Sequence, residues 1–204
     1  MTSQKSSLDK YNLMRPKMKT GDALTWEGDY WLSWLIRRWT HRSHASSIVR
    51  LLPLPHGQED VQTLIVEADQ GEVNVRRLSK KLKRYKGKCY WHPLKPEFWP
   101  HRKAIGDFLW YYVGEPYDYF SLLKNPFGCV KSKCKRLFCS EYVGGSYWNP
   151  WKDNGKPGGI PFSKLILLLA ATKNKELEKL LDGKALRPGD IAKLPIFDKE
   201  VRVL

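Results

Sequence analysis

The sequence contains no long apolar run and no recognisable secretory leader. Its longest uninterrupted apolar stretch, residues 165–171, falls far short of the roughly 20 residues that a membrane-spanning helix needs. Residues 1–7 are polar and lack the apolar core and the small-residue cleavage site of a secretory signal. These absences predict a soluble protein of the cytoplasm, while non-classical export, or delivery as a phage-borne or effector protein, stays open.

Cysteine is scarce, with four residues in the chain. Without a secretory signal we expect reduced thiols rather than a disulfide framework. Cys129, Cys134 and Cys139 are evenly spaced, which raises the alternative of a metal site. Structural zinc sites usually combine closer pairs with a second cluster elsewhere, so we expect no metal. A disulfide or a regulatory role for Cys134 stays open.

Negative charge is also in short supply. The chain has 36 Lys and Arg against 21 Asp and Glu, a formal net charge of +15, which favours anionic partners. Residues 76–88 alone contain eight basic residues. This segment is either a solvated face or a surface that holds an anionic polymer or a membrane. Nucleic acid is a less favoured partner, because no recognisable nucleic-acid-binding module surrounds the segment.

Periodicity and composition predict one domain preceded by an arm. Residues 1–18 are rich in Ser and Lys and show no apolar period, so we expect a flexible N-terminal arm followed by a single domain over residues 19–204. Segments rich in β-branched and aromatic residues, separated by short turns, predict antiparallel strands. These segments are residues 23–26, 45–52, 61–68, 72–77 and 88–92, with closing strands at 191–194 and 200–204.

Helical spacing appears between and after these strands. We expect helices starting near Glu27, over residues 105–112, from Cys139 onward, and over residues 163–181 with Ser163 as the N-cap. The layout predicts an α+β fold in which helices flank a mostly antiparallel sheet.

Three side chains could supply nucleophilic chemistry. Cys139 is expected to open a helix, where the free N–H groups and the helix dipole favour the thiolate, the reactive form of cysteine. His44 opens a strand and is the candidate general base, and Glu67 ends another strand, where its carboxylate could orient the imidazole. The rival base is His41, and the alternatives to Glu67 are Asp69 and Glu72.

Five short motifs carry a resemblance to a known family. They are Gly21-Asp22, Ser43-His44, Glu67-Ala68, Gly114-Glu115-Pro116-Tyr117-Asp118 and Phe138-Cys139-Ser140-Glu141. Their order resembles that of the circularly permuted papain-like cysteine hydrolases, the YiiX/YebB-like branch of the NlpC superfamily. The match spans roughly residues 20 to 195.

The resemblance implies a permuted papain-like (NlpC-like) fold with Cys139 as nucleophile, His44 as base and Glu67 as the third member of a triad. It also implies that Tyr117 lies beside the nucleophile and donates its hydroxyl to the oxyanion. The chemistry of the family is cleavage of an amide or ester, mainly in peptides, peptidoglycan stems or N-acylated, lipid-like substrates, and some relatives transfer acyl groups. No cofactor is implied.

A function of another class remains as the alternative. The chain could be a non-catalytic binding module that keeps the fold and holds an anionic polymer, nucleic acid or a membrane surface through residues 76–88. Such binding would be sensitive to salt and indifferent to Cys139.

Overall fold

The computed structural model describes residues 9–29, 38, 41–50, 63–69, 71–116, 139–148, 159–182 and 186–204. It is an α+β fold built on a six-stranded sheet with the strand order β4-β3-β2-β1-β5-β6, in which neighbouring strands are antiparallel. The strands are β1 (Ala23–Gly28), β2 (His44–Arg50), β3 (Thr63–Asp69), β4 (Glu72–Arg77), β5 (Gly87–His92) and β6 (Val201–Arg202). The predicted fold class is confirmed at this level.

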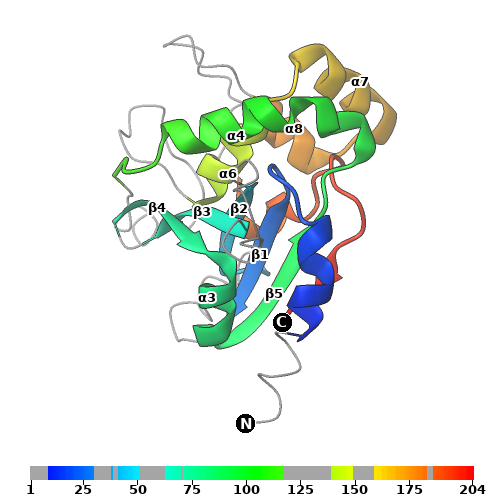
Figure 1. Cartoon of the computed structure of the whole chain (residues 1–204). Coiled ribbons are helices and arrows are strands. Elements are labelled where there is room, and N and C mark those ends of the chain that lie inside the picture. Colours follow the sequence, from blue (N-terminus) through cyan, green and yellow to red (C-terminus); the bar gives the residue numbers. More distant parts are fainter. Residues whose placement is uncertain are drawn as a thin grey trace.

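Helices lie on both faces of the sheet (Figure 1). They are η1 (Arg15–Lys17), α3 (Leu78–Arg84), η3 (Pro96–His101), α4 (Arg102–Tyr111), α6 (Cys139–Tyr147), α7 (Phe162–Thr172), α8 (Lys175–Leu181) and α9 (Pro188–Ile191). In Figure 1, α4, α6, α7 and α8 gather at the top of the view and α3 lies at the lower left, against the other face. No helix in the described residues is long and apolar enough to cross a bilayer.

The alternation of side chains along the strands creates two hydrophobic clusters. Ala45 and Val49 of β2 face the larger cluster, together with residues of α4, α6, α8 and α9. Ile48 of the same strand faces the smaller cluster, which includes Leu78 and Leu82 of α3. Successive residues of a strand point to opposite faces, so the central strands β1 and β2 are buried on both sides. Strand β1 is accordingly buried at all six positions, including the polar Thr25 and Glu27.

The N-terminal segment differs from the flexible arm predicted for residues 1–18. Residues 9–14 are helical, η1 follows, and both Tyr11 and Met18 are buried in the smaller cluster. Tyr11, Met14 and Met18 fall at i, i+3 and i+7, a short helical period that the prediction missed. Residues 1–8 lie outside the described residues.

The helix predicted over residues 163–181 is in fact two helices. The chain adopts a left-handed conformation at Lys173, with φ of 48°, and Asn174 then caps α8 by accepting from the Leu177 N–H at 2.8 Å. Pro161, and not the predicted Ser163, is the N-cap residue of α7. Apolar spacing continues across the break, so it could not locate the end of the first helix.

Two further element predictions need correction. Residues 188–191 form the short helix α9 instead of leading into a strand at 191–194, because the Asp190 carboxylate accepts from the Arg187 N–H at 3.1 Å and starts a helical turn. Of the closing strand predicted over residues 200–204, only Val201–Arg202 pairs with β5. At the other end, β1 continues through Gly28, past the Glu27 where we expected a helix to begin. Residues 30–37 lie outside the described residues.

Candidate active site

Cys139 is the first residue of α6, as the sequence predicted, and is 4% exposed. The start of the helix is held by the Ser140 hydroxyl, which donates to the Leu186 carbonyl. Farther along, the Tyr142 hydroxyl donates to the Leu109 carbonyl of α4 at 2.5 Å, and the Tyr147 hydroxyl to the Gly21 carbonyl at 3.0 Å. These three bonds tie α6 to the segment at Leu186, to α4 and to the turn before β1.

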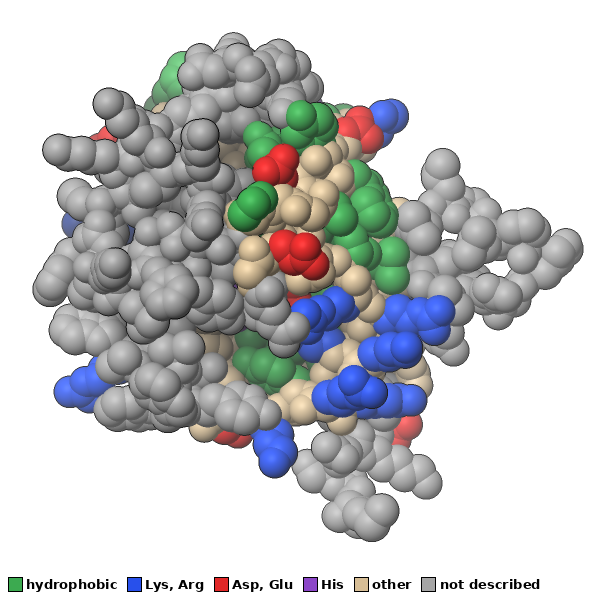
Figure 2. All heavy atoms as spheres, turned by 90° about the vertical axis from the view of Figure 1, so that its left-hand side faces the viewer, with side chains coloured by type: hydrophobic (Ala, Val, Ile, Leu, Met, Phe, Trp, Pro, Cys, Tyr) green, Lys and Arg blue, Asp and Glu red, His purple; other side chains and the backbone are tan. Residues whose placement is uncertain are grey.

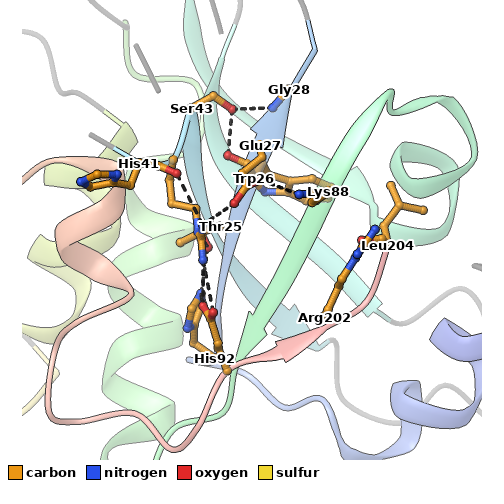
Figure 3. Close-up of polar contacts among 12 residues, drawn as sticks. Thr25, Trp26, Glu27, Gly28, His41, Ser43, Lys88, His92, Arg202 and Leu204 are labelled. Atoms are coloured by element: carbon orange, nitrogen blue, oxygen red, sulfur yellow. Dashed lines mark hydrogen bonds and ion pairs between the residues drawn. The ribbon is translucent and has the colours of Figure 1, made fainter. Parts of the chain in front are cut away.

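His44 is the first residue of β2 and lies opposite Trp26 of β1. The preceding residue, Ser43, ties this strand end to β1, because its hydroxyl donates to the Trp26 carbonyl at 2.8 Å and accepts from the Gly28 N–H at 2.9 Å (Figure 3). The Ser43-His44 pair is thus a positioning unit. The serine fixes the backbone from which the imidazole projects.

The imidazole of His44 contacts both of the other predicted triad residues. It forms a side-chain hydrogen bond with Cys139. Its Nε2 atom lies 3.0 Å from Oε2 of Glu67, which leaves Nδ1 for the sulfur. The structure therefore brings Cys139, His44 and Glu67 together in one continuous array.

Glu67 is completely buried and has a second cationic partner. Ile65 faces the smaller cluster, so Glu67, two residues further along β3, faces the same side of the sheet as α3. There the ammonium group of Lys81 bonds to Oε2 of Glu67 and lies 4.3 Å from the centre of the Trp26 ring. The guanidinium of Arg76 lies 4.0 Å from the other carboxylate oxygen.

The electrostatics favour a thiolate and an imidazolium. Burial raises the pKa of the Cys139 thiol, but the His44 imidazolium and the N–H groups of Ala45 and Ser140 outweigh burial and hold that pKa below its ordinary value. Burial lowers the pKa of His44, but the Cys139 thiolate and the Glu67 carboxylate raise it to about 9.

Glu67 stays charged for a comparable reason. Burial raises the pKa of this carboxyl, but the charges of Lys81 and His44 lower it to about 2. Lys81, Glu67, His44 and Cys139 therefore form a row of four groups, in which the pKa shifts of Glu67, His44 and Cys139 favour charges of alternating sign. Each buried charge has an opposite neighbour, which is the condition under which burial of ions is tolerated.

Lys81 is a site residue that we did not predict individually. It appeared only as one of the basic residues in the run 76–88. The available signal was its position on α3: it lies three residues after Leu78 and directly before Leu82, both of which are buried. A lysine on the inner side of an amphipathic helix needs a buried acceptor.

The other predicted residues either lie outside the described part of the chain or are described away from this array. Tyr117 lies outside the described residues, as do Cys129 and Cys134. His41 is exposed, and its carbonyl accepts from Arg42 at 3.4 Å. Glu72 is exposed at the start of β4, and the carboxylate that contacts His44 is that of Glu67.

Asp22, from the Gly21-Asp22 motif, has a structural role. Its buried carboxylate accepts from the indole of Trp91 at 2.9 Å, from the Leu94 N–H at 3.1 Å and from Arg102 at 2.7 Å. These bonds join β1 to the end of β5 and to α4. Asp22 thus ties the sheet to the helical layer that carries Cys139.

A second buried histidine, His92, belongs to a separate polar cluster on β1 and β5 (Figure 3). Its Nε2 lies 2.8 Å from the Thr25 hydroxyl, which also accepts from Arg42 at 3.2 Å. Burial and the nearby Arg42 lower the pKa of His92 to about 3, so its ring is neutral. It is a hydrogen-bonded core residue, and the carboxylate near it, that of Glu200, lies 4.0 Å from its Nε2.

Comparisons with known proteins identify a neighbour in fold. No known protein family matches the sequence, and no curated protein is similar to it. Among solved structures, the chain is similar to the metalloprotein YiiX from Escherichia coli O157:H7, with a TM-score of 0.53 and 22% sequence identity. The similarity covers 90% of this chain and 96% of YiiX. The resemblance to YiiX is thereby confirmed, as a likeness of fold.

Proposed function

We propose that the protein is a cysteine hydrolase that cleaves an amide or ester bond through an acyl-Cys139 intermediate. The observation that carries this proposal is the contiguous row of Cys139, His44 and Glu67, in which His44 contacts both other residues. A thiol next to an imidazole that is itself oriented by a carboxylate is the general arrangement of nucleophilic catalysis. The YiiX-like fold supports a permuted papain-like architecture.

The reaction begins with a thiolate. Sγ of Cys139 attacks the substrate carbonyl carbon, and the carbonyl oxygen takes the displaced electron pair as an oxyanion. When the intermediate collapses, the bond to the leaving group breaks and the His44 imidazolium protonates that amine or alcohol. The product of this half-reaction is a thioester on Cys139 with neutral His44.

Water completes the cycle. Neutral His44 takes a proton from a water molecule as the water oxygen attacks the thioester, and collapse of the second intermediate releases the carboxylic acid and the Cys139 thiolate. The imidazolium and thiolate are then restored together. An acceptor alcohol or amine in place of water would give acyl transfer by the same steps.

Glu67 and Lys81 act through His44 as positioning residues. The bond between Glu67 and Nε2 fixes the ring so that the opposite nitrogen faces Cys139. Lys81 keeps Glu67 ionised. Its ammonium group bonds to Oε2 of Glu67, the same carboxylate oxygen that contacts His44. For the oxyanion we assign the Cys139 N–H at the start of α6 and the hydroxyl of Tyr117.

The substrate class follows from the same family resemblance. We propose a peptide, a peptidoglycan stem or an acyl amide as substrate. YiiX is titled a metalloprotein. In the described part of this chain no group of three His, Cys, Asp or Glu residues could hold a metal ion, and Lys81 already bonds to Glu67, so no step is assigned to a metal.

Active-site labelling tests this proposal. Iodoacetamide or an acyl-amide probe should modify the wild-type protein at Cys139, and the rate should fall by at least tenfold in His44→Ala. Cys89, which is buried and whose pKa is raised well above its ordinary value by burial, provides the internal control for a non-catalytic thiol. Labelling that persists unchanged in Cys139→Ala would overturn the assignment.

A further inference from the structure

Helix α3 has two faces with different partners. Its inner face buries Leu78 and Leu82 and sends Lys81 to Glu67 of the candidate active site. Its outer face and flanks carry exposed basic residues. We call this set the α3 basic face: Arg77, Lys80, Lys83, Arg84 and Lys86.

The α3 basic face has no acidic partner in the described part of the chain, where no ion pair joins any of its five members to a carboxylate. By contrast, neighbouring Lys88 pairs with Glu27 at 3.5 Å, and Arg76 lies 4.0 Å from Glu67. Figure 2 shows Lys and Arg side chains gathered on the side of the molecule that carries α3 and β4. Like charges one helical turn apart repel each other, so an anionic ligand would relieve an unfavourable arrangement.

The chemistry of the face favours a polymer over a bilayer or a stacked nucleic-acid strand. None of the large exposed hydrophobic residues lies within residues 76–88, so this face offers nothing to insert into lipid. Its aromatic residue, Tyr85, is half-buried and packs edge-on against Trp26, with ring centres 4.8 Å apart, so it is not free to stack on a base. What remains is a set of cations on flexible stems, which suits repeated phosphate groups.

We propose that the α3 basic face binds a phosphate-rich anionic polymer that carries the substrate of the adjacent site. This inference rests on the proposed hydrolase function and specifies its substrate class. Because one helix provides both Lys81 in the site and the outer cations, a polymer held on α3 raises the local concentration of its own amide or ester groups beside Cys139. The recruitment is electrostatic and carries no sequence or side-chain specificity of its own.

The test measures binding of fluorescently labelled inorganic polyphosphate by anisotropy at 50–200 mM NaCl. Five contacts with phosphate predict a slope of log affinity against log salt of about −4, which is about a 10²-fold loss across that range. The face variant Lys80→Gln/Lys83→Gln/Arg84→Gln should reduce the slope to about −1 to −2. The matched control Lys103→Gln/Lys164→Gln/Lys175→Gln removes the same charge from α4, α7 and α8 and should change affinity less than threefold.

Several results would overturn the proposal. If the face variant and the control lost the same affinity for polyphosphate, only the net charge of the protein would matter for binding. A wild-type protein that ignores polyphosphate and binds vesicles of anionic phospholipid would assign the face to a membrane. Thermal melting checks that each variant folds, and alkylation of wild-type Cys139, measured without polymer, tests the hydrolase proposal separately.

Discussion

The most informative single substitution is Lys81→Met, because it removes one charge from the row of four without touching the nucleophile or the base. Methionine keeps most of the aliphatic volume that packs near Trp26 and removes the ammonium group. Glu67 then keeps His44 and the more distant Arg76 as cationic neighbours. Lys80→Met is the matched control, because that lysine is the exposed neighbour of Lys81 on the same helix.

The expected loss of stability follows from burial. Removing one partner of a buried ion pair costs roughly 3–5 kcal/mol, because the other charge stays buried without its partner. Lys81 is 13% exposed and Glu67 is 0% exposed, so the lower end applies, about 3 kcal/mol. For a chain of this length that corresponds to a decrease of about 6–12 °C in melting temperature. The control should stay within about 0.5 kcal/mol of wild type.

A second readout separates the electrostatic role from packing. The positive charge of Lys81 lowers the pKa of His44, so its removal should raise that pKa above its present value of about 9. The alkaline limb of any hydrolytic activity, where His44 loses its proton, should move to higher pH. The assays are urea unfolding and a pH profile. If Lys81→Met had the same free energy of unfolding and the same pH profile as Lys80→Met, the proposed electrostatic role of Lys81 would be refuted.

Three further predictions follow from the same contacts. Glu67→Gln should lower turnover by about 10²-fold or more, because His44 loses its orienting carboxylate, and should move the alkaline limb to lower pH; an unchanged limb would contradict this role. The pKa of Glu67 is depressed from 4.5 to about 2, so its contribution to stability, on the order of 3 kcal/mol, should be present above pH 4.5 and disappear as pH falls toward 2. Urea unfolding of wild type and Glu67→Gln at pH 6 and pH 3 checks this. The difference in free energy of unfolding between the two proteins should be smaller at pH 3 than at pH 6. Asp22→Ala should cost about 3 kcal/mol by leaving Arg102 and the Trp91 indole without their acceptor, and a melting temperature within 2 °C of wild type would count against that structural role.

Local patterns were sufficient to predict most of the sheet. Strand β4 was predicted at its observed bounds, because alternation starts after Gly71, whose φ of 95° suits the tight turn. The start of α6 at Cys139 was predicted from the local sequence. Where the pattern continued through a break, as at Lys173, the prediction joined two helices. The left-handed conformation of Lys173 and the N-cap residue Asn174 mark that break.

The sequence pointed to three residues of the candidate site but not to the fourth, Lys81. Cys139, His44 and Glu67 come from separate segments whose motifs pointed to each residue, and the fold brings the three together. Lys81 could not be distinguished from Lys80 or Lys83 by composition, because a run of basic residues does not reveal which side chain turns inward. That choice depends on how Leu78 and Leu82 pack against the sheet. The contribution of Asp22 likewise depends on β5 and α4, which are distant in sequence.

The rate of Cys139 alkylation as a function of pH tests the central claim most directly. A sulfur held as thiolate by an imidazolium should react with a midpoint clearly below the ordinary cysteine pKa of about 8.5, and the midpoint should rise in His44→Ala, where burial remains and the cation is gone. A wild-type midpoint at or above 8.5, or one that does not move in His44→Ala, would contradict the thiolate–imidazolium pair.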